Sequence, residues 1–599
     1  MGHLARVAYA PRLEGSVSAR GSTRARIASD ERPSPEARVR TLSLSLLLLP
    51  LLSSPLLAQG VTVDLDVDAD RDGRVEPGSP EDDDGEELWS AAKGAVMLYN
   101  SDDDDSDGVV DASDAVVNGV EDIKDLAPLL LAPLPGLPAG WSGRLVVDAQ
   151  AAPWVRIFRY TRATGWQLFD PAQHNPFPAA ALGRTGVFGV EARDHAQTAS
   201  AQPGLWGGEV LIEFVVEDAG GAVQGQDSVR LRVAPFVLHS NLDPVERVHV
   251  TQKTYTQAFV NALGAPVTAG GAVLAPIDGI VANPAYGVWV QDAMEFGYSA
   301  LPSPQGPRPA PAVLRSPRGK ALDAWTEDHC LGPDSGYVFK GSKRNGVGWI
   351  DWFGNLDCTP PLPGWPLGRI YAGYQGAVTL HPDVLAFLDA QRVQAPVLQI
   401  DTGWLLIGHV DETVCFVPSK TGKPYRMLVP STVRALRILQ GLDAAGKGHL
   451  KVFEGTSKET TVSALLGSTA LVTYNISLQA RIDATTQEMV SGLGLSPQDV
   501  LGIPSLFEPY GGSGQAVGLM PNLVNSLVVG DHLIAADPFG PVDGGVDQFK
   551  QPLVRALKPL GLQVDFVDDW YPYHEWLGEV HCGTNAVRTP SATPWWSVP

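Results

Sequence analysis

Four residues of the chain have side chains that could carry out nucleophilic chemistry on a cationic carbon. Cys582 lies in the stretch HCGTN near the C-terminus, where a turn could expose its sulfur. His409 and Asp411 are two residues apart in GHVDE, so on a β-strand both side chains would point to one face. Asp292 follows Trp289 by three residues in WVQDAMEFGY, which would place a carboxylate beside an aromatic wall for a planar cation.

A thiol, a histidine and two carboxylates meet the requirements for attack on a guanidinium group. A thiolate must add to the delocalised carbon, carboxylates must hold the cation, and an acid must protonate the departing ammonia. Each residue also has a structural explanation, because a lone cysteine is often a small buried residue and an aspartate often caps a turn. The residue types alone therefore do not decide between a catalytic set and a structural one.

An acidic loop from Asp103 to Asp114 has the spacing of a calcium-binding loop. Gly108 stands at position 6, where the chain must bend sharply. Carboxylates this close repel one another unless a cation neutralises them, and the alternative is a solvated acidic loop. The candidate ligands, at positions 1, 3, 5, 9 and 12, are Asp103, Asp105, Asp107, Asp111 and Asp114.

A second acidic loop begins at Asp68 with the same pattern. Asp70, Asp72 and Gly73 follow at the matching positions, but position 12 is Ser79. The closing ligand must therefore come from elsewhere, and Glu81 and Asp82 are the candidates.

Charge and cysteine content exclude some classes of protein. The formal net charge is -23, which would repel nucleic-acid phosphates and suits bound calcium or a substrate that carries arginine. The four cysteines are too few for a disulfide scaffold. A bridge between Cys330 and Cys358 stays open at this stage.

Residues 1–58 resemble a targeting segment. Many arginines precede the apolar run TLSLSLLLLPLLSSPLLAQG, which has the length of a signal peptide and is interrupted by Pro50. We expect cleavage after Ala58 and a secreted or periplasmic protein. The competing interpretation is an uncleaved membrane anchor.

The rest of the chain predicts two domains of different class. Residues 59–235 contain period-two stretches such as SGRLVVDAQ, WVRIFRY, GEVLIEFVVED and SVRLRVAP, which favour a β-sandwich that carries the acidic loops. In residues 236–599, strands alternate with helical stretches such as PDVLAFLDAQRV and STVRALRILQGLD, which favour one large α/β domain. Periodicity does not show how its sheets are arranged.

From about residue 62 onward the chain resembles the protein-arginine deiminases. The matching stretches stand in the family's order and cover most of the mature chain: LDVDADRDGRVE, WVQDAMEFGY, SPRGK, GPDSGYV, DWFGNLDCTPP, PLGRIYAG, WLLIGHVDE, MPNLVNSLVVG, PFGPV, GEVHCGTN and the terminal WW with VP. The chain looks like a secreted bacterial-type member that lacks the family's usual N-terminal cupredoxin-like domain.

The resemblance implies a role for each candidate residue. Cys582 would be the nucleophile, His409 the general acid, and Asp292 and Asp411 would grip the guanidinium of an arginine in a protein or peptide. Trp289 would line the arginine channel. The intermediate would be a covalent S-alkylthiouronium. The implied fold is a pseudo-five-fold α/β propeller behind an immunoglobulin-like domain.

Two cationic residues enter through the same resemblance. Arg318 and Lys320 stand where the family contacts the substrate backbone, but Lys320 replaces an arginine. Lysine keeps the charge and loses the two-pronged donor geometry, so free arginine or C-terminal arginine is also an expected substrate.

The resemblance further implies calcium (Ca²⁺) beside the active site. One site is retained, with side chains of Gln291, Glu295 and Asp357, and carbonyls of Phe353 and Leu356; the aspartate replaces the family's glutamate.

A second family calcium site is expected to be lost. Its ligand positions hold Ala293, Arg315 and Gly319, so two ligands are missing and a cation is added. We hypothesise that the guanidinium of Arg315 supplies the charge that calcium would bring.

Two other functions remain open at the sequence level. One is a deiminase or amidinotransferase that acts on free arginine or another small guanidino compound. The other is a calcium-dependent extracellular binding protein with a vestigial catalytic site. The sequence gives no indication of the oligomeric state.

Overall fold

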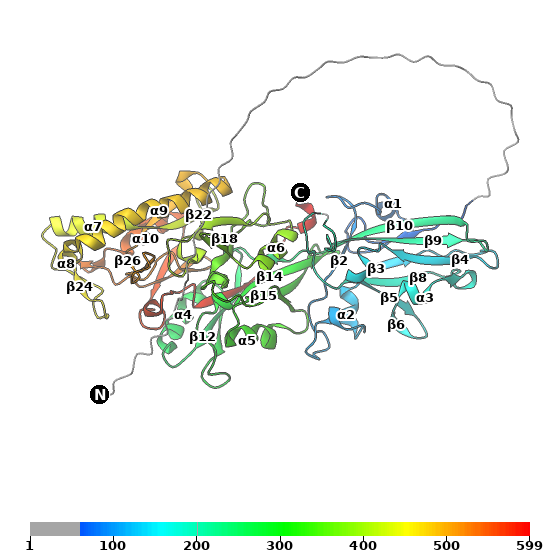
Figure 1. Cartoon of the computed structure of the whole chain (residues 1–599), viewed down its shortest axis with the longest axis horizontal. Helices are drawn as coiled ribbons and strands as arrows, with labels where there is room; N and C mark the ends of the chain where they lie inside the picture. Colours follow the sequence, from blue (N-terminus) through cyan, green and yellow to red (C-terminus); the bar gives the residue numbers. More distant parts are fainter. Residues whose placement is uncertain (1–59, 201, 599) are drawn as a thin grey trace, which may run out of the picture. The chain divides into compact units, whose positions relative to one another are not determined.

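The computed structural model describes residues 60–200 and 202–598 (Figure 1). The predicted targeting segment lies outside these residues, so its cleavage and the alternative membrane anchor stay predictions. Within the described ranges, no helix has both the length and the apolar character needed to cross a membrane.

Two five-stranded sheets occupy the N-terminal part of the described chain (Figure 1). They share one hydrophobic core, to which Phe188 and Val190 of one sheet and Ile212 and Phe214 of the other contribute. The first sheet has the order β1 (Leu65–Asp66), β3 (Ala127–Leu131), β8 (Gly186–Ala192), β5 (Val155–Thr161) and β6 (Gly165–Leu168). The second has the order β2 (Ala95–Met97), β10 (Val223–Val233), β9 (Glu209–Glu217), β4 (Ser142–Val147) and β7 (Phe177–Pro178).

The strands follow the alternation of the sequence. In β9, Val210, Ile212 and Phe214 are buried while Glu209 and Glu213 are partly exposed, because successive side chains of a strand point to opposite faces. The four stretches that predicted strands correspond to β4, β5, β9 and β10, so this part of the prediction is confirmed.

Five further sheets repeat one unit. In each unit an antiparallel strand pair is joined by a third strand that runs parallel to one member of the pair, and a helix precedes that third strand. Four of the units follow the chain in order. The first contains β14 (Met294–Leu301), β15 (Arg308–Arg315), α5 (Ala321–Cys330) and β16 (Gly336–Phe339), and the second contains β17 (Leu356–Cys358), β18 (Ile370–Gln375), α6 (Pro382–Ala390) and β20 (Leu398–Asp401). The third contains β21 (Cys415–Pro418), β22 (Tyr425–Ser431), α7 (Thr432–Ala444) and β25 (Val500–Pro504), and the fourth contains β28 (Leu527–Val529), β29 (His532–Ala536), α10 (Lys550–Leu557) and β32 (Gln563–Val567).

The remaining unit joins the two ends of this region. It contains β12 (Val245–Gln252), α4 (Gln257–Ala269) and β13 (Val273–Asp278), and its antiparallel strand is β33 (Thr584–Arg588). The turn that carries Cys582 leads directly into β33, so its position is fixed by pairing with β12. The protein is thus mixed α/β, and the predicted helical stretches are confirmed as α6 and α7.

The helices are placed by their apolar faces. In α7, Ala435, Leu436, Leu439 and Leu442 are buried at three- and four-residue spacings, which is the pattern of one face of a helix against a core. A 25-residue helix, α9 (Thr469–Leu493), lies between α7 and β25 in the chain and buries Leu478, Ile482 and Met489.

One expectation about local structure is not met, and one open question is answered. His409 and Asp411 do not lie on a strand: His409 precedes the short 3-10 helix η6 (Val410–Glu412), which contains Asp411. The physical reason is local, since the Glu412 carboxylate accepts hydrogen bonds from the backbone N–H groups of Gly408 and His409. All four cysteines are free, so the Cys330–Cys358 bridge does not form.

Candidate active site

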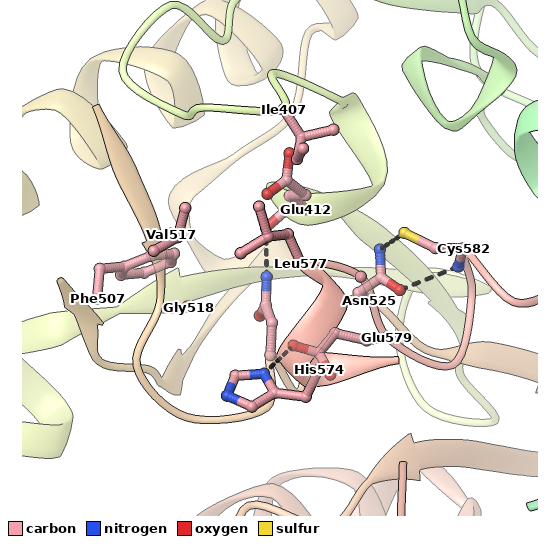
Figure 2. A pocket seen from close by; sticks show the side chains of 12 residues that line it. Ile407, Glu412, Phe507, Val517, Gly518, Asn525, His574, Leu577, Glu579 and Cys582 are labelled. Atoms are coloured by element: carbon pink, nitrogen blue, oxygen red, sulfur yellow. Dashed lines mark hydrogen bonds and ion pairs between the residues drawn. The ribbon is translucent and has the colours of Figure 1, made fainter. Parts of the chain in front are cut away.

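Cys582 is held by two neighbours from distant parts of the chain. Its Sγ donates to Asp411 Oδ2 at 3.3 Å and accepts from Asn525 Nδ2 at 3.2 Å, and its backbone N–H donates to Asn525 Oδ1 at 3.2 Å. Figure 2 shows both contacts with Asn525. The residue lies in a turn, as expected, but is only 5% exposed.

The resting Cys582 side chain is a thiol. Burial raises the pKa of the thiol well above its ordinary value, and the carboxylates of Asp411 and Asp292 raise it further. Only the thiolate is an effective nucleophile. A positive charge beside these carboxylates would lower that pKa and favour the thiolate.

His409 is oriented by contacts on both sides of its ring. Its Nε2 lies 2.9 Å from the carbonyl oxygen of Trp349, and since a carbonyl only accepts, Nε2 carries a hydrogen. The other nitrogen, Nδ1, faces Asp292 Oδ1 at 3.5 Å.

Asp292 lies in the 3-10 helix η4 (Gln291–Ala293), beside a buried guanidinium. Nη1 of Arg318 is 3.9 Å from Asp292 Oδ2 and donates to the Trp289 carbonyl at 3.2 Å, while Nε of Arg318 donates to Asp323. Burial raises the pKa of Asp292 to about 6, although His409 and Arg318 lower it. Asp292 is thus ionised at neutral pH and protonated in mild acid.

Three buried polar atoms of this site have no hydrogen-bond partner. They are Asp292 Oδ1, Asp411 Oδ1 and His409 Nδ1. Buried polar groups without partners are rare and costly, so their presence indicates a ligand. Two carboxylate acceptors fit a guanidinium, which offers five N–H donors and one positive charge.

Two glycines make room for the site. A Cβ at Gly354 would lie 2.5 Å from His409 Nδ1 and 2.9 Å from Asp292 Oδ1. A Cβ at Gly578 would lie 2.4 Å from the Trp289 ring and 3.2 Å from Cys582 Cβ. Glycine at these positions lets the three functional side chains and the aromatic wall approach the backbone closely.

A small pocket borders Cys582 (Figure 2). Glu412, Glu579 and Leu577 line it together with Asn525. Burial raises the pKa of Glu412 and of Glu579 to about 8 in each case. A cation that enters this pocket is favoured, because it would stabilise the ionised carboxylates.

The predicted substrate-contacting residues differ in accessibility. Trp289 is half-buried and packs edge-on against Tyr573 with ring centroids 5.6 Å apart. Lys320 is exposed, with Nζ 5.7 Å from the centroid of the Trp352 ring. Arg318 is only 4% exposed, with Nε donating to Asp323 and Nη1 to the Trp289 carbonyl, so its contact with the substrate backbone stays a prediction.

The predicted calcium ligands of this region share one cavity. Gln291, Glu295 and Asp357 line it. Each Asp357 oxygen accepts one hydrogen bond, from the Cys358 N–H at 2.6 Å and the Tyr371 hydroxyl at 2.8 Å, and keeps a second lone pair for an ion. The predicted carbonyl ligands follow in the adjacent η5 (Phe353–Asn355) and at Leu356.

At the site expected to be lost, the side chain of Arg315 points elsewhere. Arg315 pairs in register with Phe339, its guanidinium lies 4.4 Å from that ring, and Nη1 donates to the Tyr337 hydroxyl at 3.1 Å. The buried cation beside Asp292 is Arg318. The hypothesis that Arg315 supplies the charge of calcium stays a prediction. Ala293, which is buried, and Gly319, which has a φ of +68°, carry no side-chain oxygen, so neither offers a side-chain ligand.

The first acidic loop brings together some of its predicted ligands. Oxygens of Asp103, Asp105 and Asp111 lie within 4.8 Å of one another, and Gly108 has the positive φ that the bend requires. Asp107 and Asp114 instead accept from the backbone N–H groups two residues further on. These two predicted ligands do not join the cluster.

The second loop is closed by a neighbouring helix. Asp68 and Asp70 lie within 4.8 Å of Asp82, which belongs to α1 (Pro80–Asp83). Asp82 is one of the two closing ligands expected from the sequence; the other, Glu81, is exposed and accepts from Ser79. Asp72 does not join the cluster.

Two acidic clusters were not predicted from the sequence. Asp102 and Asp104 meet Asp125, which also binds Arg308 at 2.5 Å. A separate cluster joins Asp64, Asp66 and Asp83. Neither follows the spacing of a calcium loop, because each combines distant segments.

Sequence reasoning also missed residues of the active site. Asn525, Gly354 and Gly578 contact or border the reactive groups, yet the sequence analysis gave none of them a role. Each lies in a stretch that resembles the family, and Gly578 precedes Cys582 by only four residues, which is the signal that could have found them.

Fold and site define a mixed α/β protein with a buried cysteine beside two carboxylates and a histidine. A family model described as protein-arginine deiminase matches residues 223–597, and one described as that family's middle domain matches residues 61–173. Protein-arginine deiminase type-4 of Rattus norvegicus is 32% identical over 564 residues, which cover 90% of this chain and 83% of the relative. The type-4 protein of Homo sapiens is 31% identical over 572 residues, which cover 92% and 84%.

The chain belongs to the protein-arginine deiminase family. Among solved structures, an agmatine deiminase of C. jejuni is similar over 59% of this chain and 96% of its own, at 10% identity and a TM-score of 0.37, a likeness too weak to carry an argument.

Proposed function

We propose that the protein hydrolyses arginine side chains of proteins or peptides to citrulline and ammonia, with Cys582 as the nucleophile. One observation carries the proposal: Asp292 Oδ1, Asp411 Oδ1 and His409 Nδ1 are buried without partners around a thiol that a nearby cation would activate. Family membership supports the same reaction.

Binding of the substrate activates the nucleophile in this scheme. The guanidinium donates hydrogen bonds to the carboxylates of Asp292 and Asp411. Its charge offsets the two carboxylates that raise the pKa of Cys582, so the pKa falls and the thiolate forms next to the guanidinium carbon. The proton of the thiol passes to His409 Nδ1, which holds it for the departing nitrogen.

The reaction then proceeds in two displacements. Cys582 Sγ forms a bond to the guanidinium carbon, and the carbon–nitrogen bond to the departing ammonia breaks as His409 Nδ1 donates a proton to it. The product of this step is a covalent S-alkylthiouronium. A water molecule then adds to the same carbon, and His409 takes one of its protons and later releases it to solvent. The carbon–sulfur bond breaks as the carbon–oxygen double bond of citrulline forms, the second proton of the water restores the Cys582 thiol, and citrulline leaves.

Protein arginine is the proposed substrate class, as in the names of the relatives. Lys320 is the accessible cation near the start of α5 and would contact carbonyl groups of the substrate backbone. Its single point charge is also compatible with the carboxylate of free arginine.

Calcium binding is proposed for the two acidic loops and for the cavity lined by Gln291, Glu295 and Asp357. The converging carboxylates of the loops fit an ion that prefers oxygen ligands. Calcium there would neutralise clustered negative charge and stabilise the folded protein.

The proposed architecture and location complete the account. We propose that the five repeated units close into a pseudo-five-fold propeller, residues 236–599, behind an immunoglobulin-like domain, residues 59–235. The strand pairing of β33 with β12 supports closure of the ring. Export from the cytoplasm is proposed from residues 1–58 alone.

The function is tested by citrulline formation. The purified protein is incubated with an arginine peptide and, separately, with free arginine, and each reaction is run with calcium and with a chelator. Turnover should be lost in Cys582→Ala and kept in Cys330→Ala, which removes a thiol at the end of α5.

The pattern of turnover separates the proposed function from its alternatives. Turnover of free arginine alone would favour a deiminase of small guanidino compounds. Turnover of neither substrate, with calcium binding intact, would overturn the proposal and favour a binding protein.

A further inference from the structure

A buried carboxylate in the N-terminal sheets has no partner for either oxygen. Asp66, in β1, is 0% exposed, and both Oδ1 and Oδ2 lack hydrogen-bond partners. Glu86 is 6% exposed and its Oε2 also lacks a partner. Because buried charge without compensation is strongly unfavourable, these oxygens indicate a missing positive group.

Other carboxylates converge on Asp66 from different segments. One oxygen each from Asp64, Asp66 and Asp83 lies within 4.8 Å of the other two. Asp227, on β10, reaches the same strand and accepts from the Leu65 N–H at 2.8 Å.

The charges that act on this group are negative. Burial and then Asp64 raise the pKa of Asp66 to about 7. Burial, followed by Asp227, Asp66, Asp83 and Asp64, raises the pKa of Glu86 to about 9. A bound cation would offset this converging negative charge.

The spacing suits a divalent cation. Calcium binds oxygens at about 2.4 Å, so two ligands on opposite sides of the ion are about 4.8 Å apart. We propose that Asp64, Asp66 and Asp83 bind a divalent cation of the calcium class, with Glu86 as the neighbouring buried carboxylate.

This site is separate from the second acidic loop but adjacent to it. Helix α1 supplies Asp82 to the cluster with Asp68 and Asp70, and supplies the next residue, Asp83, to the new cluster. Two ions on either side of one short helix would fix α1 against β1. The short helix therefore links the occupancy of the two sites.

The test is the number of calcium ions bound by the full-length protein at neutral pH, measured by equilibrium dialysis with radioactive calcium. Asp66→Asn and Asp83→Asn should each bind one ion fewer than the unmodified protein. Asp84→Asn is the matched control, because this exposed aspartate is the next residue and belongs to none of the clusters. An unchanged count in both Asp66→Asn and Asp83→Asn would overturn the proposal.

A second comparison separates the new site from the loop. Asp70→Asn should lose one ion, and the double variant Asp70→Asn with Asp83→Asn should lose two. If the double variant loses only one, the two clusters hold a single shared ion and the separate site is refuted.

Thermal unfolding distinguishes loss of an ion from damage to the fold. In a chelator, Asp66→Asn should unfold at the same or a higher temperature, because a buried negative charge has been removed. With calcium added, its midpoint should rise less than that of the unmodified protein. A rise as large as in the unmodified protein would contradict the proposal. If Asp66→Asn does not fold, Asp83→Asn provides the same comparison at a partly exposed position.

Discussion

Gly354→Ala tests the geometry of the site without removing any functional group. The added Cβ would lie 2.5 Å from His409 Nδ1 and 2.9 Å from Asp292 Oδ1. Ordinary contact requires about 3.5 Å, so His409 must move by about 1 Å. A displacement of this size in a catalytic group can lower the rate about 100-fold, which corresponds to about 2.7 kcal/mol in the activation free energy.

The assay is citrulline release from an arginine peptide, analysed for kcat and KM. We expect kcat to fall about 100-fold in Gly354→Ala, with a folded protein and a small decrease in Tm. Gly441→Ala, in α7, is the matched control: a Cβ there has no atom within 4 Å, so kcat should not change and helix stability should rise by about 0.5–1 kcal/mol. An unchanged kcat in a well-folded Gly354→Ala would refute the proposed proximity of His409 and Asp292 to the reaction.

Three further results are expected at the same site. Because the pKa of Asp292 is raised to about 6, the carboxylate becomes protonated below that pH, and kcat/KM should fall in mild acid. Arg318 lowers this pKa, so Arg318→Gln should move the fall in kcat/KM to higher pH. An unmoved pH profile would contradict the role of Arg318. Burial and the nearby carboxylates raise the pKa of Cys582, so iodoacetamide should inactivate the free enzyme slowly at neutral pH and faster as the pH rises. An inactivation rate independent of pH would show that Cys582 is already a thiolate in the free enzyme. Lys320→Arg should raise kcat/KM for an arginine peptide several-fold and leave kcat/KM for free arginine unchanged. An equal gain for both substrates would show that Lys320 does not contact the peptide backbone.

Local patterns gave the strands and helices correctly where one face of the element meets the core. The alternation in β9 and the three- and four-residue spacing in α7 are visible in the sequence because burial imposes them. The segment around His409 shows the limit of this approach. A spacing of two residues also fits a 3-10 turn, and the Glu412 carboxylate stabilises that turn by accepting from the backbone.

The site was predictable in its reactive residues and not in their supports. Cys582, His409, Asp292 and Asp411 stand in the stretches that resemble the family, and the structure brings them together around unpartnered atoms. Asn525 binds Cys582 from 57 positions earlier in the chain, which no local spacing could show. The direction of a side chain is equally hidden when it depends on strand register.

Arg315 illustrates the dependence on register. Its partner across β15 and β16 is Phe339, so its guanidinium lies on that ring, while Arg318 in the following turn reaches Asp292. The sequence showed an added cation near the site but not which of the two arginines faces the carboxylate. Ala293 and Gly319 were simpler to interpret, because neither side chain can coordinate an ion.

The central claim is that Cys582 forms a covalent bond to the guanidinium carbon, and mass spectrometry of an acid-quenched reaction tests it directly. The protein is mixed with an arginine peptide, stopped during turnover, digested and analysed at the peptide that contains Cys582. The account predicts an adduct on Cys582 equal to the substrate less ammonia, absent when the substrate carries lysine in place of arginine. Citrulline formation without any adduct on Cys582, or undiminished turnover in Cys582→Ala, would contradict it.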